Sequence, residues 1–307
     1  MPTTTPPARA ALRQKKGATP AVERDAASPW WAAAAAAATV GMIASGIGLA
    51  SVHAIYGQET RSFVDQAIAQ DLVNLVVAGP ATLLLAWLAW RGSVRAHLLW
   101  TGVLTFTVYN YVIYTMSIHV GPLFLAWVAV LGLTFFSLVG GLRAARPPVV
   151  AATLAGAPRR VVGWYLVVIA AVFSMLWLSD IVPAVLAGRP PTGAADLALP
   201  SNPVHVLDLA VFLPAVLAIG RLVLLRRPLG LTLAPAATVF LVMTGLPILV
   251  TPLVTAARGG EPAWSVMGPV GVITAVGVAV LIVLLRSRPG VAPSGRGRVV
   301  TAGARKS

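Results

Sequence analysis

The sequence contains no cysteine and few charged residues, and both absences narrow the classes of protein to which it can belong. Without cysteine there is no disulfide, no thiol redox chemistry, no thiolate-bound metal and no iron–sulfur cluster. Charged residues make up only 10% of the 307 residues, against about a quarter in an average soluble domain. Because 58% of the residues are hydrophobic, the chain is too apolar for a soluble globular domain.

Acidic residues are especially scarce: 9 Asp and Glu stand against 23 Lys and Arg, which gives a formal net charge of +14. In a soluble protein this excess would suggest nucleic-acid binding. Here the basic residues lie almost entirely in the two tails and in short loops between apolar runs. That placement indicates membrane topology and attraction to anionic lipid head groups at the basic tails, and nucleic acid is not an expected partner.

The motifs of several enzyme classes are also missing. The sequence has no phosphate-binding loop, no HExxH, no GxSxG and no dinucleotide fingerprint. Arg221 lies at the end of an apolar segment, so no cationic side chain within a segment is placed to bind a phosphate. Nucleotide-driven transport within this chain is therefore not expected, and the sequence identifies no cofactor.

Long apolar segments fill the rest of the chain. Eight of them have about 20 residues or more, the length that an α-helix needs to cross a hydrocarbon core of roughly 30 Å. The sequence therefore predicts an all-α integral membrane protein with eight transmembrane helices. The expected spans are 30–56, 67–90, 98–120, 122–142, 161–188, 205–225, 229–254 and 266–285. Val52-His53-Ala54 has the spacing of a signal-peptide cleavage site, but the apolar stretch before it is too long for a signal core.

The basic loops predict how the chain is oriented. If every segment spans, both tails and most loop arginines lie on one side, whereas Arg61, Arg189 and Arg258 lie on the other. By the positive-inside rule both termini are cytoplasmic, and the expected location is the plasma (cytoplasmic) membrane. The predicted parts are a disordered basic cytoplasmic tail (1–29), a first four-helix repeat (30–142), a cytoplasmic linker (143–160), a second four-helix repeat (161–285) and a second disordered basic cytoplasmic tail (286–307).

The division into repeats rests on an internal similarity at an offset of about 134 residues. Asp71-Leu-Val-Asn74 aligns with His205-Val-Leu-Asp208, and a Pro-Ala pair follows six residues after each motif. The same shift carries Trp30-Trp31 onto Trp164-Tyr165. Because each half has four spans, the second half enters from the same side as the first. The two repeats are therefore expected to be parallel, related by a pseudo-two-fold axis along the membrane normal.

Polar residues within the spans are the candidate functional site, since an ionisable group inside a bilayer is costly and usually functional. Asp71 and Asn74 share one helix face, as do His205 and Asp208. The other candidates, expected in the same outward-facing site for a substrate or an ion, are Asp180, Asn110 and Tyr114. An alternative interpretation is that Asp71 and His205 are helix caps and that the tyrosines pack between helices.

Metal binding is a further option at this site. The residue types that zinc or copper would require are present as His53, His119, His205 and Asp208, although only the last two form a local motif. In outline, two parallel four-helix halves are similar to haem A synthase, whose haem ligands are histidines inside matching spans. The fourth and eighth spans here contain no histidine, so the likeness concerns architecture and implies no haem site.

Three functions fit these observations. The first is a transport or channel-like protein with a carboxylate/histidine site between the repeats, linked to protons or cations. The second is a structural or assembly subunit without chemistry, because small-residue rows such as Gly46/Ala50 and Gly271/Ala275 suit close helix packing in a homo- or hetero-oligomer. The third is a membrane-embedded enzyme that binds a metal or a quinone. The expected partners are the lipid bilayer, its anionic head groups and the other subunits of a homo- or hetero-oligomer.

Overall fold

The computed structural model describes residues 20–287, and these residues form helices without a β-strand. In chain order the elements are α2 (Arg24–Ala50), α3 (Val52–Tyr56), α4 (Arg61–Val73), η2 (Asn74–Ala78), α5 (Gly79–Trp90), α6 (Val94–Ser117), α7 (Phe124–Ala144), α8 (Pro147–Thr153), α9 (Arg159–Leu186), α10 (Thr192–Ala195), α11 (Pro203–Leu207), η3 (Asp208–Phe212), α12 (Leu213–Leu224), α13 (Pro228–Ala257), η4 (Trp264–Val266) and α14 (Met267–Arg286).

Seven helical segments are long and apolar enough to cross a membrane, which confirms a multi-pass, membrane-like helical protein. They are Arg24–Ala50, Arg61–Trp90, Phe124–Ala144, Arg159–Leu186, Pro203–Leu224, Pro228–Ala257 and Trp264–Arg286. The remaining predicted span, 98–120, is also helical, as the 24-residue α6, but its Thr, Tyr and Asn residues make it less apolar. More than half of α6 is buried, so the most polar of the long helices lies inside the bundle.

The first helix differs from its prediction at both ends. It begins at Arg24, although residues 1–29 were expected to be a disordered tail. Pro29 lies inside it and cannot donate to the carbonyl of Asp25, and the Ser28 hydroxyl bonds that carbonyl instead, at 3.3 Å. The helix ends at Ala50, because Ser51 has a non-helical backbone (φ −134°, ψ 44°), and α3 continues separately. The basic tails otherwise lie outside the described residues.

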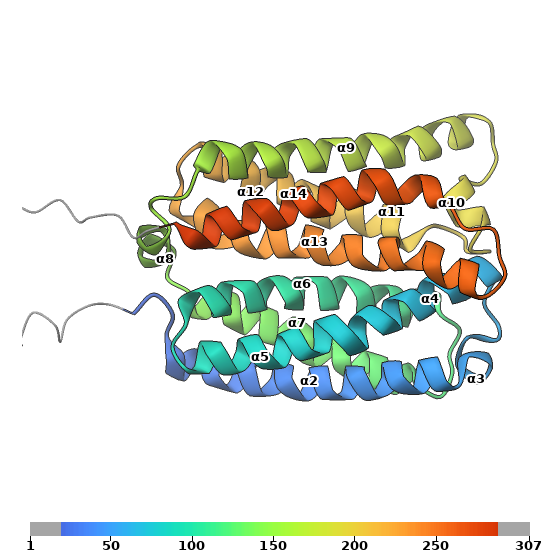
Figure 1. The fold of residues 1–307 in the computed structure, drawn as a ribbon, viewed down its shortest axis with the longest axis horizontal. Coiled ribbons are helices and arrows are strands. Elements are labelled where there is room, and N and C mark those ends of the chain that lie inside the picture. Colours follow the sequence, from blue (N-terminus) through green and yellow to red (C-terminus); the bar gives the residue numbers. More distant parts are fainter. Residues whose placement is uncertain (1–19, 288–307) are drawn as a thin grey trace, which may run out of the picture.

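The helices form two groups that meet along α6 and α13. In the first group α2 packs on α5 and α7, and α6 packs on the same two helices. In the second, α12 packs on α9 and α13, and α14 packs on α13. Between the groups, α13 contacts α6 and α4, whereas α6 contacts α11. Figure 1 shows the groups side by side, with the start of α2, the end of α14 and the linker helix α8 at one end. The opposite end is called the distal end below.

Each group contains one π-helical turn, at η2 and η3, and the two begin 134 residues apart at Asn74 and Asp208. Each turn is followed by a proline, Pro80 or Pro214, in the first turn of the next α-helix. A proline cannot donate to the residue four positions earlier, and the wider turn accommodates its ring. The Gly79 and Leu213 amides instead reach back five residues, to the carbonyls of Asn74 and Asp208. The two π-turns thus begin at Asn74 and Asp208, which are both candidate site residues.

Candidate functional site

The Asp71 carboxyl group is buried in the first group of helices and is held by two tyrosines. It accepts hydrogen bonds from the hydroxyls of Tyr56, at 2.6 Å, and Tyr114, at 3.0 Å. A Cβ on Gly48 of α2 would lie 2.3 Å from this carboxyl group, so only glycine permits the approach.

A row of side-chain amides continues from this cluster toward the second group. Asn74 begins the π-turn one helical turn after Asp71, and its Oδ1 accepts from Gln70 Nε2 at 3.0 Å and from Asn110 Nδ2 at 3.4 Å. Asn74, Asn110 and Tyr114 are all buried. The structure therefore brings four of the predicted site residues, Asp71, Asn74, Asn110 and Tyr114, into one neighbourhood between α4, η2 and α6.

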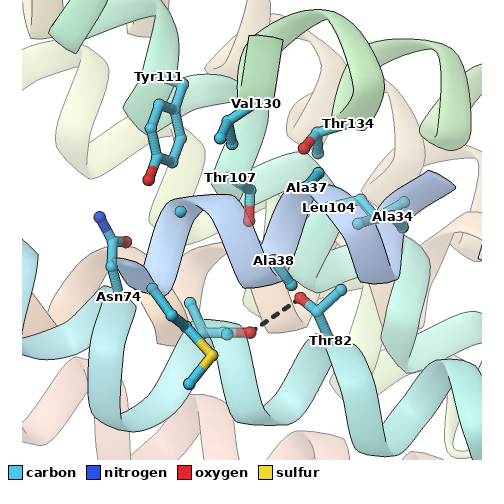
Figure 2. A pocket seen from close by; sticks show the side chains of 14 residues that line it. Ala34, Ala37, Ala38, Asn74, Thr82, Leu104, Thr107, Tyr111, Val130 and Thr134 are labelled. Carbon is cyan, nitrogen blue, oxygen red and sulfur yellow. Dashed lines mark hydrogen bonds between the residues drawn. The ribbon is translucent and has the colours of Figure 1, made fainter. Parts of the chain in front are cut away.

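Behind Asn74 lies a small hollow among α2, α5, α6 and α7. Figure 2 shows the Asn74 amide and the Tyr111 hydroxyl at one side of it and Thr82, whose hydroxyl bonds the Ala78 carbonyl at 2.8 Å, at the other. Its volume is about 20 Å³. Since a single water needs roughly 10–15 Å³ measured with a water-sized probe, the hollow admits about one water and no larger ligand.

In the second group, Asp208 is the counterpart of Asn74. Asp208 is 7% exposed, and its carboxyl group accepts a hydrogen bond from Trp177 Nε1 at 2.8 Å. The same Trp177 ring lies against His205, with ring centroids 4.7 Å apart. The tryptophan of α9 thus touches both members of the predicted His205/Asp208 pair, and the pair is ordered through an aromatic residue that the sequence did not single out.

Asp180 lies elsewhere. Its two carboxyl oxygens each accept a backbone hydrogen bond at 3.1 Å, one from Thr192 and one from Gly193 at the start of α10. Asn202 fixes the same loop, because its Nδ2 donates to the Gly193 carbonyl at 3.0 Å and its Oδ1 caps α11. Asp180 therefore holds the distal loop against α9 and does not share a pocket with Asp71 or Asp208.

A cavity of about 380 Å³ separates the two groups in the distal half of the bundle. Its walls come from α4 and α6 on one side and from α9, η3, α13 and α14 on the other. Among the predicted site residues, Asn110, Tyr114 and Asp208 line it. Asp71 and Asn74 lie behind this wall and bond to Tyr114 and Asn110, whereas His205 contacts it through Trp177.

A second hollow, of about 410 Å³, adjoins the first at the distal end. The two share Gln66, Thr251, Pro252 and Ala263 as wall residues. Arg61, Asp65 and Glu261 also line the second hollow. Asp65 forms an ion pair with Arg258 at 2.7 Å, which ties the end of α13 to α4. The large cavity therefore leads toward charged residues at the distal end.

The candidate metal ligands do not assemble. His53 is exposed, and His119, also exposed, pairs with Glu59 at 2.8 Å rather than with another histidine. Across residues 20–287, no group of three His, Cys, Asp or Glu side chains is close enough to hold a metal ion. The candidate set of His53, His119, His205 and Asp208 does not come together at one metal, because His53 lies in the short helix α3 and His119 in the loop after α6, whereas the other two lie in the second group.

Several residues of the site were missed from the sequence. Gln66 and Gln70 precede Asn74 at four-residue intervals, so a polar stripe on one face of α4 could have been found from spacing alone. Tyr56 and Trp177 gave no such signal, since aromatic residues in apolar segments usually pack between helices or lie at the membrane interface.

Comparison with known proteins adds no relative to this description. No family model, no curated protein and no solved structure matches the chain.

Proposed function

We propose that this protein moves a small solute across a membrane, as a transporter or a channel-like protein, by way of the cavity between its two groups of helices. The observation that carries the proposal is that this cavity of about 380 Å³ is lined from both groups and has a carboxyl group, Asp208, in its wall. Substrate sites of many transporters lie at the interface between two repeats. A carboxyl group within membrane-spanning helices is costly to bury and is therefore a functional candidate.

The proposed architecture has eight spans in two parallel four-helix repeats, with α6 as the span that is less apolar than the other seven. The paired π-turns, each followed by a proline, support it. So do the contacts between the groups: α6 and α13, the third helix of each half, face each other, and each also touches the second segment of the opposite half. A pseudo-two-fold axis along the membrane normal would produce such reciprocal contacts between the two halves.

The proposed orientation puts the distal end outside the cell and both termini in the cytoplasm, in the plasma membrane. Apart from Arg61, Arg189 and Arg258 at the distal end, the arginines of residues 20–287 lie in loops and helix ends at the opposite end, where α2 begins and α14 ends. By the positive-inside rule, this placement supports the proposed orientation. The cavity would then open outward. Asp208, and Asp71 through Tyr114, are the groups that would link the movement of solute to protons or cations, with Asn74 and Asn110 as polar neighbours.

The absence of cysteine makes this proposal directly testable. Thr244→Cys places the only thiol of the chain in the cavity wall on α13, whereas Thr238→Cys places it on the same helix at a fully buried position outside the cavity. A membrane-impermeant thiol reagent should label the first variant in both right-side-out and inverted vesicles, because a transport pathway must be reached from both sides. The second variant should stay unlabelled. Labelling of Thr244→Cys from one side only, or from neither, would contradict the proposal.

A structural or assembly subunit is the second candidate, and one observation favours it. Asp65, Asp71 and Asp180 all have local partners, as a protein without chemistry would require. The Gly46/Ala50 row is in addition accessible on α2, since a Cβ on Gly46 would meet nothing within 4 Å. Such a row can receive a helix of another chain. The labelling experiment separates the two candidates, because a subunit of this kind needs no access to Thr244.

A further inference from the structure

We infer that the ligand of the large cavity is an organic cation with an aromatic or apolar body, and that Asp208 supplies its counter-charge. This inference rests on the proposed function, since it names the class of solute for the same cavity. The first observation is electrostatic. Of the described residues that line the cavity, Asp208 is the only one with an acidic or basic side chain. A carboxyl group buried in the distal half of the bundle, with no Lys, Arg or His among the described residues of the cavity wall, lacks the opposite charge that buried acids normally have.

The second observation is the aromatic character of the wall around Asp208. Trp177 donates to the carboxyl group at 2.8 Å. Tyr109, which also lines the cavity, packs edge-on against Phe212 and Phe240, with ring centroids 5.0 and 5.4 Å apart. The negative face of an aromatic ring attracts cations, and this attraction strengthens where water is excluded. Aromatic rings beside a lone carboxyl group therefore suit a desolvated cation better than an anion or a sugar-like polar solute.

The third observation is that polar groups in the wall are left unused. The hydroxyl of Thr274 is buried without a hydrogen-bond partner among the described residues, and that of Tyr109, which lies beside the Asp208 carboxyl group, forms no hydrogen bond of normal geometry to it, although both side chains line the cavity. Such groups are uncommon in folded proteins, because each costs about 1–3 kcal/mol of desolvation. A ligand with a hydrogen-bonding group, or waters that accompany it, would satisfy them. The cavity volume of about 380 Å³ lies within the range of roughly 300–1,000 Å³ that is usual for small-molecule sites.

The approach to the cavity also favours a cation. At the distal end five acids (Glu59, Asp65, Asp180, Asp196 and Glu261) stand against three arginines (Arg61, Arg189 and Arg258). Two of these arginines are engaged at the rim, where Arg258 pairs with Asp65 and Arg61 donates to the Arg258 carbonyl at 2.7 Å. Three of the acids are engaged as well, Asp65 with Arg258, Glu59 with His119 and Asp180 with backbone amides, so the net excess of two acids over arginines is what raises the local concentration of cations.

The test uses three probes of one shape and different charge on the purified full-length protein in lipid nanodiscs. They are the cation N-methyl-4-phenylpyridinium, its neutral isostere 4-methylbiphenyl and the anion biphenyl-4-carboxylate, each at a free concentration set by equilibrium dialysis. Two quantities are measured: the dissociation constant, and the concentration that halves the rate of labelling of Thr244→Cys. Both should be at least tenfold lower for the cation than for either isostere. Asp208→Asn should remove that preference, whereas Asp25→Asn, a change at an exposed acid at the opposite end of the bundle, should keep it.

Either of two results would overturn the inference: no preference for the cation in the wild-type protein, or a preference that persists in Asp208→Asn. If Asp208→Asn does not give a monodisperse sample, the wild-type ratios and the protection of Thr244→Cys still decide, because neither needs that variant. The outcome is also separate from that of the proposed function. Two-sided labelling without a cation preference would remove the ligand class alone, whereas a cation preference with one-sided labelling would remove transport and leave a cation-binding site.

Discussion

Removal of one hydroxyl group at Tyr56 should weaken the whole membrane bundle. Tyr56→Phe deletes the 2.6 Å hydrogen bond to Asp71 and leaves Tyr114, at 3.0 Å, as the remaining side-chain donor to that carboxyl group. A hydrogen bond to a charged partner contributes about 1.5–3 kcal/mol in soluble proteins, and interhelical hydrogen bonds in membranes contribute about 0.6 and at most about 1.7 kcal/mol. The two ranges overlap at about 1.5 kcal/mol, which is the loss of stability expected for Tyr56→Phe. A loss of this size lowers the equilibrium ratio of folded to unfolded protein about tenfold.

The structure offers a matched control for this change. The Tyr165 hydroxyl is buried and has no hydrogen-bond partner within residues 20–287. Tyr165→Phe removes the same atom but no bond, so it should leave stability unchanged or raise it slightly. Reversible unfolding in mixed micelles measures both variants. Asp71→Asn combined with Tyr56→Phe should show coupling between the two positions. Equal effects of Tyr56→Phe and Tyr165→Phe, or additive effects of the first with Asp71→Asn, would refute the reasoning.

Three further changes test the packing and the distal end. Gly102→Ala should cost about 1–3 kcal/mol, because its Cβ would lie 2.5 Å from a side chain and 2.9 Å from a backbone oxygen of α13. Gly132→Ala, whose Cβ meets nothing within 4 Å, should be neutral or stabilise by up to about 1 kcal/mol, and thermal unfolding compares the two. Arg258→Gln strands Asp65, whose side chain is 3% exposed, and should cost about 2 kcal/mol, less than the 3–5 kcal/mol of a fully buried pair. Adding Asp65→Asn should recover most of that loss, and a double variant less stable than either single one would argue against the ion pair. Asp180→Ala should speed proteolysis of the loop between α9 and α11 without changing global unfolding, and an unchanged cleavage rate would argue against its role in holding that loop.

Periodicity and repetition made part of the site predictable. Asp71 and Asn74 in the first half, and His205 and Asp208 in the second, were found because polar residues interrupt apolar segments at helical spacing and recur at one offset. The structure places the first pair behind the cavity wall and the second pair at or beside it. Asp180 shares their chemistry but binds backbone amides, because the loop that folds onto it cannot be located from local sequence.

The amino-acid sequence by itself determined that this chain is a multi-pass helical bundle, and it located most helix boundaries to within a few residues. Apolar length, prolines and caps act locally along one chain segment, so they can be read without knowing the fold. Only the tertiary structure decided which polar groups meet. The sequence did not show that Trp177 reaches Asp208, that Tyr56 reaches Asp71, or that a cavity remains between α6 and α13. Those contacts depend on the rotation and packing of helices far apart in the chain, which the side chains of all of them set together.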